Sequence, residues 1–191
     1  MTQLLPDAAP PVSGPSDASA SASAPPEPVV RLRVPTEEDA YAWHQLFDDP
    51  DVMEFIGGRR AELSAYHEIT ARQRRHDAEH GFCLWTLLDD QDRVLGFTGA
   101  QPWPRPWGPT GEIEIGWRLA RSAWGKGYAT AAARATLDRL RERGVPRVVA
   151  MVQTANLRSV AVTRRLGMTL AETYEVPGPG DRRAHCFRLE L

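Results

Sequence analysis

Lysine is almost absent from this sequence. Of its 23 basic residues, only Lys126 is a lysine, and the rest are arginines. The formal net charge is −2, so no excess of one sign favours binding to nucleic acid or to an acidic membrane surface. No apolar run approaches the roughly 18 residues of a membrane span, and the N-terminus lacks the basic and apolar segments of a secretory signal. We therefore expect no nucleic-acid partner and no membrane association.

Cysteine is also scarce, since only Cys83 and Cys186 occur, each within an apolar run. We predict buried free thiols in a reducing compartment, and hence a cytoplasmic location. Arginine in place of lysine, with much alanine and proline, is typical of GC-rich genomes and points to a bacterial source. His76 and His80 have the spacing of two metal ligands, but Asp77 stands where the metalloprotease motif requires Glu. We expect no metal site.

Residues 1–28 contain no aromatic side chain, and Ala, Ser and Pro fill 18 of the 28 positions. Such a composition cannot bury enough apolar surface to offset the entropy lost on ordering. We predict that residues 1–28 are disordered and that residues 29–191 form one domain, which is large enough to bury a core. All three charges of the tail are acidic, so the domain carries 23 basic and 22 acidic residues.

Hydrophobic spacing in the domain alternates between strand and helix periods. It predicts strands near 30–34, 81–88, 93–100, 112–120, 147–153, 168–176 and 184–191. It predicts helices near 36–47, 61–80, 127–143 and 156–167, with Asn156 capping the start of the last and Gly144 and Gly167 following helix ends. The arginine-rich face near residue 73 is interpreted as solvated. This order predicts a three-layer α+β fold, a mixed sheet with helices on both faces.

A tight glycine turn, Gly125-Lys126-Gly127, lies between the strand that ends at Leu119 and an alanine-rich helix. The first N–H groups of a helix lack internal partners, and the helix dipole adds partial positive charge there. Glycine lets a ligand approach the backbone, and Lys126 adds a full charge. The turn therefore predicts an anion site for a diphosphate, although glycines that serve geometry alone remain the alternative. The P-loop and dinucleotide patterns do not fit, because Ser or Thr does not follow Lys126 and no acidic residue ends the next strand.

Two segments together resemble a known family. "EIEIGWRLARSAWGKGYATAAARATL" and "NLRSVAVTRRLGM" are similar to the GNAT superfamily of N-acetyltransferases, and most to the RimJ/RimL-type branch that acetylates ribosomal-protein N-termini. The resemblance covers residues 30–191. It implies a mostly antiparallel mixed sheet in which the parallel strands 112–120 and 147–153 splay apart at one end. It also implies acetyl-CoA as the co-substrate, with its pantetheine arm in that gap and its diphosphate on the glycine turn.

The same resemblance assigns residues to the acetyl-CoA site, including Trp124 at a position where the family usually has Gln or Arg. The implied residues are Trp117, Leu119, Trp124, Gly125, Lys126, Gly127, Tyr128, Ala129, Thr130 and Asn156.

Acetylation of an amine requires a base, because a free α-amino group with a pKa of about 7.7–8.0 is partly protonated at neutral pH. Glu112 and Glu114 alternate with apolar residues, so they are expected on one face of their strand. Glu114 matches the acidic position of the branch and is the preferred base, with Glu112 as the second candidate. The tyrosine acid of many family members falls at Thr163, a poor donor, so Ser159 is the candidate acid.

Several alternatives stay open at the level of sequence. The acceptor is a protein N-terminal amine or a small-molecule amine, and the protein is a monomer or a homodimer. A non-catalytic acyl-CoA sensor on the same fold would bind acetyl-CoA without turning it over. A nucleotide-binding module that uses the same glycine turn would bind ATP in competition with acetyl-CoA.

Overall fold

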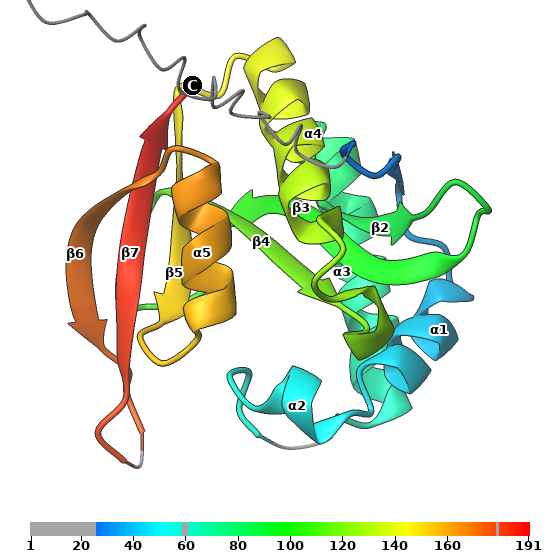
Figure 1. Ribbon diagram of the computed structural model, residues 1–191, viewed down its shortest axis with the longest axis horizontal. Coiled ribbons are helices and arrows are strands. Elements are labelled where there is room, and N and C mark those ends of the chain that lie inside the picture. Colours follow the sequence, from blue (N-terminus) through cyan, green and yellow to red (C-terminus); the bar gives the residue numbers. More distant parts are fainter. Residues whose placement is uncertain (1–25, 59–60, 179) are drawn as a thin grey trace, which may run out of the picture.

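The computed structural model describes residues 26–58, 61–178 and 180–191, so residues 1–25 of the predicted tail lie outside the described part. Within these ranges the chain forms one sheet with helices on both faces (Figure 1). The strands are β1 (Arg31–Arg33), β2 (Leu84–Leu88), β3 (Val94–Pro102), β4 (Ile113–Leu119), β5 (Arg147–Gln153), β6 (Thr169–Glu175) and β7 (Arg183–Glu190). The α-helices are α1 (Asp39–Leu46), α2 (Pro50–Met53), α3 (Leu63–His80), α4 (Tyr128–Glu142) and α5 (Leu157–Arg165).

The sheet has the strand order β1-β2-β3-β4-β5-β7-β6. Its neighbours pair antiparallel except β4 and β5, which run parallel. These two strands share a single registered pair, Glu114 with Val149, although each strand has seven residues. Figure 1 shows them diverging beyond this point. The structure thus confirms the predicted α+β fold and the splayed parallel pair.

Two apolar layers hold the helices to the sheet. On one face, α4 and α5 pack against inward side chains of β4, β5 and β7, such as Ile115, Val148 and Phe187. On the other face, α1 and α3 contribute Trp43 and Tyr66, which pack with Phe97 of β3. Burial of such side chains stabilises the fold by about 1.5–3 kcal/mol each. Cys83 and Cys186 are buried free thiols, as predicted.

Capping residues lie at the helix ends where the sequence predicted them. The Oδ1 of Asn156 accepts a hydrogen bond from the Ser159 N–H at 3.1 Å and caps the start of α5. Gly144 and Gly167 follow α4 and α5 with φ of 69° and 76°, a left-handed conformation that side chains rarely adopt. None of the described helices is both long and apolar enough to cross a membrane.

One short helix was not predicted. The segment after α1 was expected only to end that helix, whereas Pro50–Met53 form the extra turn α2. Its start is stabilised by Asp49, whose carboxylate accepts a hydrogen bond from the Asp51 N–H at 2.9 Å, and by Pro50 at the first helical position. This turn places Val52 beside the cavity described next.

Candidate active site

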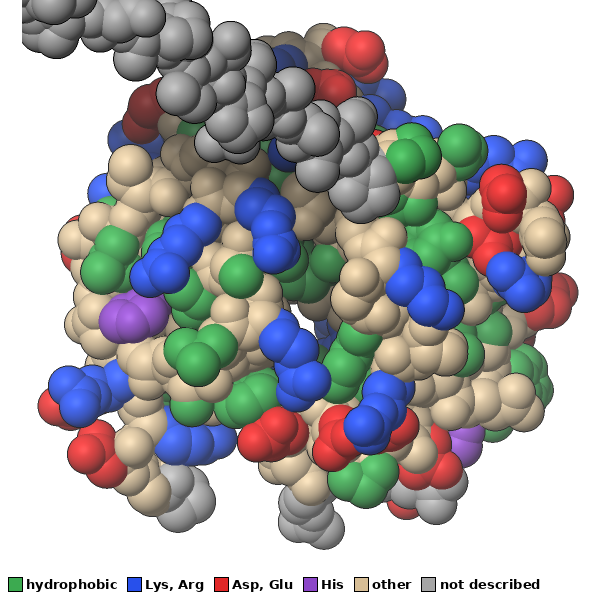
Figure 2. Space-filling model, in the orientation of Figure 1, with side chains coloured by type: hydrophobic (Ala, Val, Ile, Leu, Met, Phe, Trp, Pro, Cys, Tyr) green, Lys and Arg blue, Asp and Glu red, His purple; other side chains and the backbone are tan. Residues whose placement is uncertain are grey.

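A cavity of about 890 Å³ lies among the C-terminal end of β4, the starts of α4 and α5, and the segment around α2. Figure 2 shows it as a hollow near the centre of the molecular face, bordered by Lys and Arg side chains. The structure brings together around it all ten residues expected to contact acetyl-CoA. They are Trp117, Leu119, Trp124, Gly125, Lys126, Gly127, Tyr128, Ala129, Thr130 and Asn156, and the candidate acid Ser159 also lines the cavity.

The glycine turn has the backbone conformation of an anion-binding loop. Gly125 and Gly127 have φ of 73° and 83°, in the left-handed region that glycine adopts without strain. A Cβ at Gly125 would meet no atom within 4 Å, so a ligand could approach this stretch of backbone closely. No side chain caps the start of α4, which leaves its first N–H groups for another acceptor.

The cavity carries an excess of positive charge. Its carboxylates Glu27 and Asp51 are ion-paired, the first with Arg134 at 2.6 Å and the second with Arg121. Within the part of the chain that the structure describes, no ion pair joins four further cations of the lining, Arg118, Lys126, Arg158 and Arg165. Unpaired cations around a cavity favour an anionic ligand.

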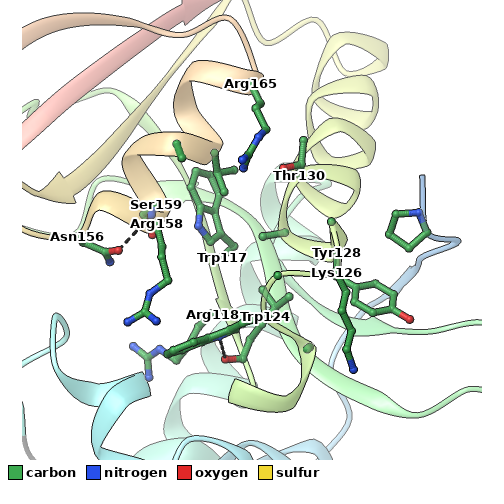
Figure 3. A pocket seen from close by; sticks show the side chains of 18 of the residues that line it. Trp117, Arg118, Trp124, Lys126, Tyr128, Thr130, Asn156, Arg158, Ser159 and Arg165 are labelled. Atoms are coloured by element: carbon green, nitrogen blue, oxygen red, sulfur yellow. Dashed lines mark hydrogen bonds between the residues drawn. The ribbon is translucent and has the colours of Figure 1, made fainter. Parts of the chain in front are cut away.

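Trp124 links the turn to both walls of the cavity. Its indole N–H donates a hydrogen bond to the Leu119 carbonyl at 3.0 Å. The guanidinium carbon of Arg158, on α5, lies 4.3 Å from the centre of the Trp124 ring, and Figure 3 shows this side chain reaching across from α5. A cation–π contact of this kind holds Arg158 over the cavity without neutralising its charge.

Glu114 lies on β4 directly opposite Gln101 of β3. Burial raises the pKa of Glu114 to about 7, and a hydrogen bond from Gln101 and the charge of Arg105 act in the opposite direction. A carboxyl group with such a pKa exchanges protons readily at neutral pH, which is the property required of a general base.

A buried chain of hydrogen bonds fixes the orientation of Gln101. The Leu84 N–H donates to Oε1 of Gln73 at 2.9 Å, and Nε2 of Gln73 then donates to Oε1 of Gln101 at 3.0 Å. The amide nitrogen of Gln101 is thereby left to donate to Glu114. Gln73 is fully buried, whereas its neighbours Arg72 and Arg75 on the face interpreted as solvated are exposed.

Glu112, the second candidate base, has a different environment. It precedes β4, which begins at Ile113, and its carboxylate accepts hydrogen bonds from Arg147 at 2.7 and 2.8 Å. Arg188 lies 3.9 Å from the same carboxylate. This bidentate contact ties Glu112 to Arg147 and joins the starts of β4 and β5, so the carboxylate of Glu112 is already engaged in an ion pair.

The hydroxyl candidates on α5 also differ. Thr163 is fully buried and donates to the Val160 carbonyl at 2.8 Å, so its hydroxyl serves the helix. Ser159 lines the cavity, and Figure 3 shows it near Asn156 at the start of α5. Ser159 is therefore the better placed of the two for proton transfer.

The histidine pair of α3 has no further metal ligand near it in the described part of the chain. The rings of His76 and His80 have centroids 5.8 Å apart. Among the described residues, no group of three or more His, Cys, Asp or Glu side chains could hold a metal ion.

The sequence of residues 30–169 matches the model of the acetyltransferase (GNAT) domain, which covers well over half of the chain. The chain belongs to the GNAT acetyltransferase family. The matched range contains the glycine turn and both strands of the splayed pair.

Two curated proteins are similar in sequence to this chain. The uncharacterized protein YkkB of Bacillus subtilis is 33% identical over 147 residues, which are 75% of this chain and 84% of that protein. The FsC-acetyl coenzyme A-N(2)-transacetylase of Aspergillus fumigatus is 30% identical over 143 residues. These are 69% of this chain but only 60% of the fungal protein, so the chain spans little more than half of that enzyme.

Solved structures share the GNAT fold. The protein yncA of Salmonella typhimurium, assigned as an acetyltransferase and solved with its cofactor acetyl-CoA, has a TM-score of 0.67 at 16% identity and covers 85% of this chain and 94% of its own. The ribosomal-protein-alanine N-acetyltransferase of Brucella melitensis has a TM-score of 0.68 at 21% identity. The match covers 84% of this chain and 99% of that protein. The ribosomal-protein branch is one among many such neighbours, so the resemblance extends to the family rather than to that branch.

Proposed function

We propose that this GNAT domain is an acetyl-CoA-dependent N-acetyltransferase that acts on a primary amine. The observation that carries the proposal is the position of Glu114, a carboxyl group that titrates near pH 7 at the last registered pair before β4 and β5 diverge. Further along β4, residues 117–119 and the glycine turn border a cavity of the kind that a thioester carrier requires, although Glu114 itself is not among the residues that line it.

The residues around the cavity fit acetyl-CoA. The turn from Gly125 to Ala129 offers backbone N–H groups to a diphosphate, and Lys126, Arg158 and Arg165 supply unpaired positive charge. Strand β4 has no registered partner on β5 beyond Glu114, which leaves backbone groups for an extended ligand. When bound, acetyl-CoA supplies the thioester whose acetyl group becomes the new amide and whose thiol departs.

Glu114 provides the base for this reaction. With a pKa of about 7 it is substantially ionised at neutral pH and can accept the proton of an ammonium group, directly or through one water. Gln101 donates its hydrogen bond to the carboxylate form and holds it in place. Ser159, which lines the cavity from α5, is the candidate that returns a proton to the departing thiolate.

The proposal is tested by thiol release from acetyl-CoA in the presence of primary amines and of N-terminal peptides. We expect release that depends on acceptor and saturates with it, with mass spectrometry showing an added acetyl group on nitrogen. Hydrolysis without acceptor serves as the control. Tight binding of acetyl-CoA by calorimetry without turnover for any amine would instead support the sensor, and competition by ATP would support the nucleotide module.

Substitution of Gln101 tests how Glu114 is held. In Gln101→Leu the carboxylate of Glu114 loses its amide donor, so the pKa of Glu114 rises. The rising part of the profile of kcat/KM against pH therefore moves to higher pH. Gln101→Glu places a second carboxylate opposite the first and moves this limb further. At pH 7 we expect kcat/KM to fall about 3- to 10-fold for Gln101→Leu, with recovery at high pH. A loss that is equal at every pH would show a purely structural role for Gln101.

A further inference from the structure

Arg118 is a cation of the cavity that the proposed binding of acetyl-CoA does not use. It lies on β4 with its guanidinium carbon 5.2 Å from the ring centre of Phe47 and 5.3 Å from that of Phe97. Both rings belong to the apolar layer under α1 and α3, on the opposite face of the sheet from α4 and α5. Lys126, on the turn before α4, and Arg165, on α5, approach the cavity from the other side.

The guanidinium of Arg118 has no acidic partner among the described residues. Its Nε is buried and makes no hydrogen bond, and the hydroxyl of Tyr66 is the polar group beside it. Burial lowers the pKa of Arg118 from its usual value, although not enough for a guanidinium to become neutral at physiological pH. Arg118 is only partly exposed, and a guanidinium largely removed from water is costly unless an ion of opposite sign pairs with it.

Arg118 shares a face of β4 with the proposed base. Residues 114, 116 and 118 alternate with residues that face α4, so Glu114 and Arg118 project to the same side of β4. Their Cα atoms are about 13 Å apart along the strand. Gly116 lies between them, opposite Gly99 of β3. A Cβ at Gly116 would meet no atom within 4 Å, so the space above the strand between base and cation is open.

We propose that the acceptor is an amine that also carries a carboxylate, and that the guanidinium of Arg118 binds this carboxylate while Glu114 receives the proton of the amine. The apolar side chains Val52, Phe55 and Ile56, which line the cavity near α2, flank the path of the acceptor. Figure 3 shows the side chain of Arg118 beside the Trp124 indole, toward the end of the cavity nearest α1 and α2. This inference rests on the proposed function and narrows its substrate class.

Matched acceptor pairs test the inference. In the first series, each free amino acid is compared with its amide. In the second series, a short peptide with Asp as its second residue is compared with the same peptide carrying Asn at that position. We expect kcat/KM to favour the carboxylate member at least about 10-fold, the range of a charge-assisted hydrogen bond. The two series distinguish a free amino acid from an acidic N-terminus. Calorimetric binding of the same pairs to the protein saturated with coenzyme A provides a readout that requires no turnover.

In Arg118→Gln, the ratio of kcat/KM between the carboxylate and the neutral acceptor should fall to about one. Arg118→Lys keeps the charge without the planar guanidinium, so it should retain part of this preference. Arg158→Gln is the matched control. It removes another cation of the same cavity and should weaken acetyl-CoA binding while the acceptor preference persists. The far-UV circular dichroism spectrum of Arg118→Gln shows whether that variant is folded.

Three outcomes would overturn the inference. They are a wild-type preference near one, a preference that survives in Arg118→Gln, or a loss in Arg118→Gln that affects only coenzyme A affinity. If neutral amines are acetylated while the wild-type preference is near one, the proposed function stands and this inference fails. If no amine is acetylated, the proposed function fails, and the calorimetric comparison still decides whether Arg118 binds carboxylates. The wild-type comparison decides even if both Arg118 variants are unfolded.

Discussion

Replacement of Gly125 by Asp should weaken the binding of acetyl-CoA by about 100-fold or more. The new carboxylate would stand at the turn where backbone N–H groups and the dipole of α4 favour an anion, and it would repel the diphosphate. Asp tolerates the left-handed conformation better than most residues, and the position has open space around it. Isothermal titration calorimetry with acetyl-CoA measures the loss.

Gly144→Asp is the matched control for this change. Gly144 also has a left-handed φ, 69° against 73° at Gly125, and its Cβ would also meet open space. It follows the far end of α4, so it carries the same added charge and backbone strain away from the turn. The acetyl thioester of pantetheine, which lacks phosphates, should bind wild type and Gly125→Asp equally. An equal loss of acetyl-CoA affinity in Gly125→Asp and Gly144→Asp would refute the role of the turn.

Replacement of Glu114 by Gln should lower kcat by about 10²- to 10⁴-fold, the usual contribution of a general base, and leave acetyl-CoA affinity unchanged. In the wild type, kcat/KM should rise with pH through about 7, because the carboxyl group must lose its proton before it can accept one. The variant should lose this limb, and only the ionisation of the acceptor amine should remain. Stopped-flow thiol release between pH 5.5 and 9 measures both effects.

Stability measurements show whether the loss of kcat in Glu114→Gln arises from unfolding. The pKa of Glu114 is raised from 4.5 in the unfolded chain to about 7 in the fold, so the native state binds the additional proton between these values. The contribution of Glu114 to the free energy of unfolding is therefore lost as pH rises from about 4.5 to 7. Glu114→Gln removes this dependence and should be at least as stable as the wild type at pH 8 in urea denaturation. A destabilised variant at pH 8 would contradict the assigned environment.

The sequence predicted the backbone features of the site because these depend on local chemistry. The glycine turn, the Asn156 cap and the glycines after α4 and α5 require particular residues at particular positions, so their identities were sufficient. The four-residue helix α2 escaped prediction, because so short a segment shows no helical period and "DDPD" has the composition of a turn.

The electrostatics of the site depended on residues distant in sequence and could not be predicted in the same way. Glu112 and Glu114 look equivalent in a strand pattern, and only the approach of Arg147 from β5 separates them. Gln73 lies among arginines on a helix that reads as solvated, yet it reaches Gln101, 28 residues away, inside the domain. Arg118 was not singled out from the sequence, because no local pattern indicates that Phe47 and Phe97 enclose its guanidinium.

The single registered pair between β4 and β5 has a mechanical consequence. On one side, β1 to β4 form a continuous ladder, and on the other β5, β7 and β6 form a second one, so the seam is the least reinforced line across the sheet. Small rotations of the two half-sheets about this hinge would alter the width of the crevice and leave both ladders intact. We expect a ligand bound along the seam to join the two half-sheets and to limit such rotations.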